Sequence, residues 1–274
     1  MRGGRPAVLP GATGGIGAAI AAALAPRCAT LVLVARDRGR LDSLAATLAQ
    51  HGPALRVVVV AADLSTATGR AAVAGAARAL PGGIDLLVNN AGIGDFAWFE
   101  AEAEADIERV IVTNLLAPVL LTRTLLPLMH RGAPRGGSSV INVGSILGDI
   151  GNPGNVAYST SKYGLRGFSE ALRRELHGSG VQVQYLAPRA TRTPLNSAAQ
   201  DALNAELGTG NDNPQVVAQA LLDLVDGGRA EMHLGWPERF FVRLNRLLPS
   251  VVDRALGRRA TVVRRHASMN EGER

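Results

Sequence analysis

The chain has 274 residues, of which 47 % are hydrophobic, enough for a sizeable core in one large domain or two small ones. Its single cysteine, Cys28, excludes an internal disulfide and a cysteine-based metal cluster, and with its five histidines scattered we expect no metal site. The formal charge of +6 is uneven, because residues 236–274 hold nine arginines and four acidic residues, which makes nucleic acid an unexpected partner for the body of the protein.

Short runs rich in Val, Ile and Leu alternate with longer segments of helical periodicity. The short runs predict strands at 7–9, 30–35, 55–61, 86–89, 139–143, 181–186 and 231–234. The periodic segments predict helices at about 15–25, 38–50, 67–80, 103–131, 156–178 and 214–227. This alternation is typical of βαβ units, so we expect an α/β fold with a doubly wound, mostly parallel, Rossmann-like sheet in a single domain over residues 1–235.

A glycine-rich turn follows the first predicted strand. It reads Gly11-Ala12-Thr13-Gly14-Gly15-Ile16-Gly17 and leads into an alanine-rich helix. Glycines at 11, 15 and 17 allow a tight turn in which backbone N–H groups and the helix N-terminus approach a pyrophosphate. The turn therefore predicts a dinucleotide site.

Arg36 directly follows the second predicted strand, where an acidic residue would normally hold an adenosine 2′-hydroxyl. A guanidinium at this position suits a 2′-phosphate, so we expect NADP(H) in preference to NAD(H). Arg38 is a candidate to assist, although a surface arginine at a turn is also common.

Lys162 is the only lysine, since the other 28 basic residues are arginines. It lies four residues after Tyr158, so both side chains share one face of a helix. A compact ammonium fits beside a phenol, whereas guanidinium is larger, planar and forked. The single lysine therefore indicates a place where an ammonium is required.

Together these motifs resemble the short-chain dehydrogenase/reductase family, in its short single-domain branch, over about residues 5–235. The turn from Gly11 to Gly17 is similar to the family's glycine motif, and Tyr158 and Lys162 supply its Tyr-x-x-x-Lys. The other matching positions are Asp63 and Leu64 after the third strand, Asn90, Ala91 and Gly92 after the fourth, Asn114, Ser145, Pro188 and Thr193.

The resemblance implies hydride transfer between a nicotinamide cofactor and a carbonyl or alcohol carbon. Tyr158 would exchange the proton, with its pKa brought toward neutrality by the Lys162 ammonium and an oxidised nicotinamide. Lys162 would also bind the nicotinamide ribose, Ser145 the substrate oxygen, and Asn114 a water that connects Lys162 to solvent. The implied cofactor contacts are Gly11, Thr13, Gly14, Gly15, Ile16, Gly17, Arg36, Asp63, Leu64, Asn90, Ala91, Gly92, Tyr158, Lys162, Pro188 and Thr193.

Two positions depart from the family's pattern. Pro10 replaces a threonine before the glycine turn, which removes a hydroxyl and a backbone N–H. Arg189 replaces the glycine that usually follows the proline beside the nicotinamide. Either change would alter the geometry or affinity of the cofactor cleft. For Arg189 and Arg192 we favour solvent-facing positions, with contact to an acidic substrate as the alternative.

Apolar residues accompany the expected catalytic positions, namely Phe96, Trp98 and Phe99 after Gly92, and Ile146, Leu147 and Ile150 after Ser145. They predict either a pocket wall for a bulky, apolar ketone, aldehyde or alcohol, or ordinary packing or a subunit contact. Residues 190–213 break the strand–helix alternation, so we expect an irregular substrate lid there.

Residues 236–274 are predicted to be a basic, helical C-terminal extension. Phe240, Leu244, Leu247, Leu248 and Val251 recur at helical spacing beside arginines, with a break expected at Pro249. Residues 236–265 hold eight arginines and two acidic residues. Three roles stay open for this helix: packing against the body or a second subunit, covering the pocket mouth, or lying on an anionic membrane.

These observations favour an NADP(H)-dependent carbonyl reductase or alcohol dehydrogenase acting on a small molecule. The alternative is a non-catalytic nucleotide-sensing or scaffold protein that kept the fold; epimerases and dehydratases of the extended family are disfavoured by the short chain. The family implies a homo-oligomer, a dimer or a tetramer. With no cleavable leader and no apolar run of the roughly 18 residues that span a bilayer, we expect a cytoplasmic protein, peripheral at the inner membrane surface if the basic helix binds lipid.

Overall fold

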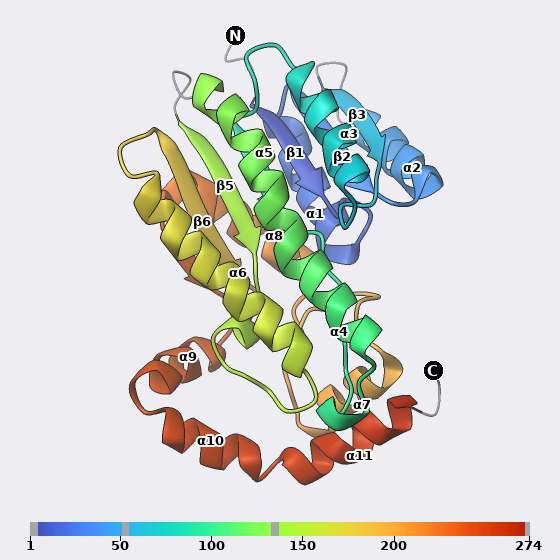
Figure 1. Ribbon diagram of the computed structural model, residues 1–274, viewed down its shortest axis with the longest axis vertical. Coiled ribbons are helices and arrows are strands. Elements are labelled where there is room, and N and C mark those ends of the chain that lie inside the picture. The colour runs from blue at the N-terminus through green and yellow to red at the C-terminus, as the bar shows by residue number, and fades with distance from the viewer. Residues whose placement is uncertain (1–4, 51–54, 133–136, 272–274) are drawn as a thin grey trace.

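The computed structural model describes residues 5–50, 55–132 and 137–271. A seven-stranded sheet, parallel throughout, runs through its centre in the order β3-β2-β1-β4-β5-β6-β7 (Figure 1). The strands are β1 (Pro6–Pro10), β2 (Thr30–Ala35), β3 (Arg56–Ala61), β4 (Leu86–Asn89), β5 (Ser138–Val143), β6 (Val181–Ala187) and β7 (Glu231–His233). The predicted strands and the Rossmann-like α/β fold are confirmed.

Helices cover both faces of the sheet, with α1, α2 and α8 on one face and α3, α5 and α6 on the other (Figure 1). Their bounds are α1 (Gly15–Leu24), α2 (Arg38–Ala49), α3 (Ala67–Arg78), α4 (Glu104–Ile111), α5 (Ala117–Gly132), α6 (Val156–Glu175) and α8 (Pro214–Gly227). Strand β2 shows why the strands are apolar throughout: Leu31 and Leu33 enter one core layer, and Val32 and Val34 enter the other.

Helices α4 and α5 join through a π-helical turn, Val112–Leu116, into one long run. By length and composition the stretch Glu104–Met129 could cross a membrane, so the expectation that no apolar run is long enough was wrong. In this structure Leu121, Leu125 and Met129 are buried in the core layer against the sheet. The run therefore serves as a core helix of the fold.

The strand order reverses between β1 and β4, because β2 and β3 extend the sheet to one side and β5, β6 and β7 to the other. At such a switch point the loops after neighbouring strands diverge and leave a crevice at the carboxyl ends. The glycine turn after β1, the segment after β4 and Ser145 after β5 all lie at this edge.

The lid helix and the helices of the C-terminal extension lie below the carboxyl edge of the sheet in Figure 1. The expected irregular lid contains a helix, α7 (Ala198–Glu206), and residues 236–271 form α9 (Glu238–Leu247), α10 (Pro249–Gly257) and α11 (Ala260–Glu271). The predicted break at Pro249 is confirmed. Helix α11 packs on α7, where Val263 and Ala267 share a small core with Ala199 and Leu203.

Candidate functional site

The glycine turn is closed against the segment after β4. Gly11 has a φ of +70°, and a Cβ there would lie 2.7 Å from the Cα of Ala91. Asn90 Nδ2 donates to the Gly11 carbonyl at 3.0 Å, and a Cβ at Gly17 would overlap that same carbonyl. The N-cap residue of helix α1 is Gly14, which offers no side-chain cap, and the first turn has no acidic residue, so the N–H groups of this turn are open to a pyrophosphate.

Pro10 does not disturb this turn. It is buried at the end of β1 in register with Val34, and Ala12 N still donates to the Val34 carbonyl at 3.1 Å. Sequence reasoning missed Arg40, whose Nη2 donates to the Thr13 carbonyl at 2.8 Å and braces the turn from α2.

Arg36 is exposed at the end of β2 and makes no hydrogen bond or ion pair with the described residues. Arg38, in contrast, is paired with Asp42 at 3.0 Å. Hydrogen bonds from Ser65 hold the pKa of Asp63 below its usual value, and the nearby Arg36 charge lowers it further. Within the described part of the chain, Arg36 is therefore an unpaired cation at this corner, beside Asp63.

The four predicted catalytic side chains come together at the carboxyl end of β5. Lys162, on α6, is buried and donates to the Val143 carbonyl at 3.1 Å, with its Nζ 5.6 Å from the centre of the Tyr158 ring. Tyr158 lies beside Ser145, within reach of a hydrogen bond to it. Asn114 lies in the π-helical turn, where it accepts from the N–H of Ile93 and donates to its carbonyl. Their catalytic roles stay predictions.

Burial shifts the pKa values of Tyr158 and Lys162. It raises the pKa of Tyr158, and the hydrogen bond with Ser145 offsets part of that rise. It also lowers the pKa of Lys162 to about 8. The expected lowering of the Tyr158 pKa is therefore not produced by the protein's own groups, because removing water disfavours the phenolate more than the hydrogen bond with Ser145 favours it.

Tyr185 supports the Ser145 loop from beneath, and sequence reasoning missed it. It is fully buried on β6, and its hydroxyl lies 3.4 Å from both the N and the O of Ser145. A Cβ at Gly144 or Gly148 would overlap the Tyr185 hydroxyl. The two glycines that flank Ser145 were the available signal for this buried ring.

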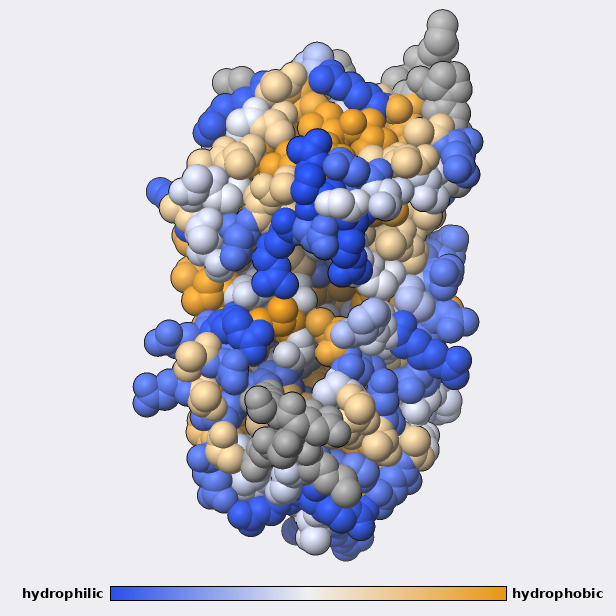
Figure 2. Space-filling model, turned by 90° about the vertical axis from the view of Figure 1, so that its right-hand side faces the viewer, coloured by the Kyte–Doolittle hydropathy of each residue, from blue (hydrophilic) through white to orange (hydrophobic). Residues whose placement is uncertain are grey.

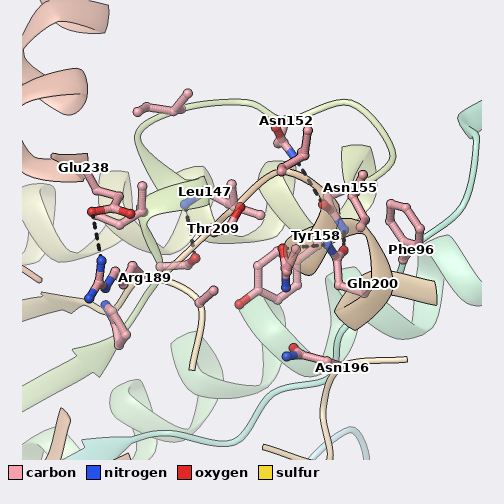
Figure 3. A pocket seen from close by; sticks show the side chains of 18 of the residues that line it. Phe96, Leu147, Asn152, Asn155, Tyr158, Arg189, Asn196, Gln200, Thr209 and Glu238 are labelled. Carbon is pink, nitrogen blue, oxygen red and sulfur yellow. Dashed lines mark hydrogen bonds and ion pairs between the residues drawn. The ribbon is translucent and has the colours of Figure 1, made fainter. Parts of the chain in front are cut away.

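A cavity of about 870 Å³ opens beside Tyr158 and Ser145. Of the predicted wall, Phe96, Ile146, Leu147 and Ile150 line it. Trp98 and Phe99 do not: Trp98 packs on the small core of α7 and α11 with Arg264 5.1 Å from its ring, and Phe99 is exposed. In Figure 3, Tyr158 lies between the amides of Asn155 and Gln200 on one side and Arg189 and Glu238 on the other.

The lid and the C-terminal helices complete the cavity. Their lining residues include Leu203 and Leu207 from the lid and, from the extension, Phe241, Leu244, Val251, Val252, Leu256 and Val263. Figure 2 shows a hollow across the middle of one side of the molecule, with hydrophobic atoms inside it. Of the three roles left open for the extension, the structure shows two: α9 packs against the body through Val242, and the inner sides of α9 and α10 cover the pocket.

Arg189 ties the lid to the extension. Its Nη2 lies 2.7 Å from Asp212 of the lid, and its Nη1 lies 3.5 Å from Glu238 of α9 (Figure 3). The Arg189 side chain passes close to two glycines. A Cβ on Gly210 would lie 2.7 Å from Arg189 Nη1, and a Cβ on Gly235 would lie 2.5 Å from Arg189 Cδ. The favoured solvent-facing position was therefore wrong for Arg189, because two carboxylates hold it in the pocket wall, whereas Arg192 is exposed.

Replacing Arg189 with glycine, the family's usual residue, should loosen the lid. Asp212 and Glu238 would face each other without the cation between them, so we expect the free energy of unfolding to fall by about 1–3 kcal/mol and KM to rise more than kcat falls. Urea denaturation and steady-state kinetics measure both. Arg192→Gly, three positions along the same segment, is the matched control, and equal losses in the two variants would contradict the role of Arg189.

Comparison with known proteins gives a consistent picture. The family model described as short chain dehydrogenase matches residues 5–204. The ketoacyl reductase HetN of Nostoc sp. (strain PCC 7120) is 32 % identical over 230 residues, 84 % of this chain and 78 % of that protein. The bulky-bulky ketone specific alcohol dehydrogenase from Comamonas testosteroni superposes with a TM-score of 0.74 at 29 % identity, covering 91 % of this chain and 94 % of that one. A short-chain dehydrogenase/reductase from Burkholderia phymatum in complex with NAD has the same fold, with a TM-score of 0.80 at 24 % identity and coverage of 91 % and 95 %.

Proposed function

The chain belongs to the short-chain dehydrogenase/reductase family, and from this premise we propose that it transfers a hydride between NADP(H) and the carbonyl or alcohol carbon of a bulky, apolar substrate. Oxidoreductase activity on a carbonyl or alcohol with NAD(P)(H) follows from the family itself. The observation that carries the finer proposal is the position of Tyr158, which lies beside Ser145 in the wall of a cavity of about 870 Å³.

The residues at the carboxyl edge of the sheet fit a nicotinamide dinucleotide. The open N-terminus of α1 and the close approach of Gly11 to Ala91 suit a pyrophosphate, and the unpaired Arg36 suits a 2′-phosphate. Lys162 would bind the nicotinamide ribose. When bound, the cofactor supplies or accepts the hydride.

The protein's own part is to hold the substrate oxygen and to move one proton. In reduction, Ser145 Oγ donates a hydrogen bond to the carbonyl oxygen, and Tyr158 Oη gives that oxygen its proton. Burial keeps the Tyr158 phenol protonated and thus ready to act as an acid. In oxidation the same atoms work in reverse, with Tyr158 accepting the proton of the alcohol.

The shape of the cavity supports a bulky substrate. Its volume lies toward the upper end of the roughly 300–1,000 Å³ of small-molecule sites. Apolar side chains of the Ser145 loop and of α9 and α10 form much of the wall, while Asn155, Gln200 and Asn204 form a hydrogen-bonded row of amides. A ketone or alcohol with a large apolar group beside the reacting carbon fits the apolar part of this wall.

Arg36→Asp should reverse the cofactor preference. The variant loses a charge-assisted contact to the 2′-phosphate and adds repulsion, so the ratio of kcat/KM for NADPH over NADH should fall by about 10²-fold or more. Initial rates with each cofactor measure the ratio. Arg56→Asp is the matched control, because it makes the same charge change at the first residue of β3, at the amino ends of the strands and away from the carboxyl edge. This variant should leave the ratio unchanged. An unaltered ratio in Arg36→Asp would rule this residue out as the selector.

A substrate panel tests the proposed function. Purified protein is mixed with NADPH and aliphatic, aromatic and polycyclic ketones, and NADPH consumption is followed by absorbance. We expect turnover that improves with the apolar bulk of the ketone. No turnover with any carbonyl, and none with the matching alcohols and NADP, would favour the non-catalytic alternative.

A further inference from the structure

The outer side of α9 and α10 carries an unusual concentration of exposed apolar side chains. Six of the twelve large hydrophobic residues that are exposed in the described chain fall between residues 236 and 251, namely Trp236, Phe240, Phe241, Leu247, Leu248 and Val251. Trp236 and Leu247 are 70 % and 79 % exposed. The rings of Trp236, Phe240 and Phe241 contact one another in series, with centroids 6.2 Å and 5.8 Å apart. This set is called the tail patch below.

Cations without partners surround the tail patch. The arginines of this region that form no ion pair within the described chain are Arg239, Arg243, Arg254, Arg258 and Arg259, and all five are exposed. On α9 the exposed Phe240 and Leu247 are seven positions apart and thus lie on one side, with Arg243 between them in sequence. Of the two acidic residues of α9 and α10, Glu238 binds Arg189, whereas Asp253 has no ion pair with any described residue.

The body of the protein holds this surface outward. Val242 is buried against Ile146 and Tyr185, and Arg246 binds the buried Asp149 at 2.6 Å. At the other end, Arg265 and His266 of α11 both bind Glu206 of the lid, at 2.6 Å and 2.8 Å. Helix α9 anchors one end of the extension and α11 anchors the other. The tail patch therefore cannot turn inward without breaking these contacts.

The tail patch is also continuous with the cavity. Phe241 and Val251 line the cavity and are 41 % and 47 % exposed, so they form its rim on this side. Leu244 and Val252 continue the apolar lining inward. An apolar molecule that leaves a surface in contact with α9 and α10 therefore meets apolar side chains from the rim into the cavity.

The charge pattern decides what covers this surface. A second copy of the chain would bring five unpaired arginines against five, which is unfavourable. Nucleic acid would satisfy the arginines but leave the aromatic and leucine side chains against phosphates and sugars. A lipid bilayer with anionic head groups satisfies both, since the arginines meet the head groups while Phe240, Leu247 and Leu248 enter the upper acyl region.

We propose that the tail patch docks the protein on an anionic membrane surface, and that the cavity takes an apolar substrate from the lipid through the rim formed by Phe241 and Val251. The docking rests on the tail patch and the unpaired arginines around it, whereas the second part rests on the proposed function. Docking brings the reductase to a substrate that is dilute in water and concentrated in lipid.

Vesicle binding tests the docking with the full chain. Vesicles of equal parts phosphatidylglycerol and phosphatidylcholine should sediment the protein at low salt and release it as salt rises, and pure phosphatidylcholine should bind it weakly. The triple variant Arg239→Glu, Arg243→Glu, Arg254→Glu should lower the partition coefficient at least about tenfold. Phe240→Ser with Leu247→Ser should weaken binding while the remaining binding keeps its dependence on salt.

The matched control reverses three exposed arginines elsewhere, Arg56→Glu, Arg78→Glu and Arg123→Glu, which changes the net charge equally. These residues form no ion pair within the described chain. Circular dichroism confirms folding of each variant. The proposal would be overturned if the wild type did not bind at low salt, or if both triple variants lost binding equally. It would also be overturned if sedimentation equilibrium showed that the wild type is a dimer and that the triple variant of Arg239, Arg243 and Arg254 is not.

Two further arms separate this proposal from the proposed function. Tyr158→Phe should bind vesicles like the wild type, so docking is measured without turnover. The triple variant of Arg239, Arg243 and Arg254 should reduce a ketone embedded in anionic vesicles more slowly than the wild type does. Its rate of reduction of a small water-soluble ketone should match that of the wild type. Equal rates on the embedded ketone would refute delivery from lipid, and absent turnover on every ketone with vesicle binding intact would refute the proposed function alone.

Discussion

Replacing Tyr158 with phenylalanine should lower kcat/KM by about 10²–10⁴-fold while NADPH binding changes little. The substitution removes one hydroxyl from the wall of the cavity and leaves the ring, so packing around α6 is preserved. The lost atom is the one that gives its proton to the substrate oxygen, and the remaining hydrogen bond from Ser145 cannot supply a proton at the same rate. NADPH fluorescence titration and steady-state kinetics measure the two quantities separately.

Tyr163→Phe is the matched control for this variant. Tyr163 lies on the same helix, five positions further along, but it does not line the cavity and is 39 % exposed. Its hydroxyl can be removed without touching the proposed proton path, so turnover should stay within about threefold of the wild type. Equal losses in both variants would indicate a general effect on α6, and turnover by Tyr158→Phe at the wild-type rate would refute the assignment of the proton donor.

The strands and most helices could be predicted because both faces of a parallel sheet are buried. Each strand then becomes a continuous apolar run, such as residues 30–35, and the intervening helices keep one apolar side. The close approach of Gly11 to Ala91 and the pairing of Asn90 with the turn follow from local motifs, so sequence reasoning brought together the right segments at the edge of the sheet.

The lid helix α7 shows a signal that was present and was not used. Ser197 caps the helix by accepting from the N–H of Gln200 at 3.2 Å. Ser-x-x-Gln before an alanine-rich stretch is the pattern of a capping box, which predicts a helix start at this point. The polar and glycine-rich residues on either side of α7 suggested an irregular segment instead.

The anchoring of the extension had no local signal. Arg246 and Asn245 reach Asp149 across nearly 100 residues of sequence, and His233 binds the other oxygen of the same carboxylate at 2.9 Å. Burial raises the pKa of Asp149, but the hydrogen bonds from His233 and Arg246 more than offset it, so the carboxylate stays charged. Only the tertiary fold shows that the loop carrying Ser145 and the helix α9 share this buried charge.

Lys162→Arg should lower kcat/KM at least about 10²-fold, because a displaced cation misplaces both the phenol and the ribose. Lys162 is buried, its Nζ lies 3.1 Å from the Val143 carbonyl, and a Cβ on Gly92 would lie only 3.6 Å from that Nζ. A planar guanidinium cannot occupy this space without moving α6 or the segment after β4. A wild-type rate in the variant would remove the argument drawn from the single lysine of the chain.

The pH profile separates the charge of Lys162 from its shape. Burial disfavours the ammonium and lowers the pKa of Lys162 to about 8, so this side chain is charged below that pH and neutral above it. Burial moves the pKa of Tyr158 the other way, so the phenol stays protonated through the same range. Wild-type kcat/KM for reduction should therefore fall as pH rises through about 8, whereas the residual rate of Lys162→Arg should show no such fall, since guanidinium stays charged. A fall near pH 8 in the arginine variant would assign the titration to another group, and a flat wild-type profile would mean that the charge on Lys162 is not required.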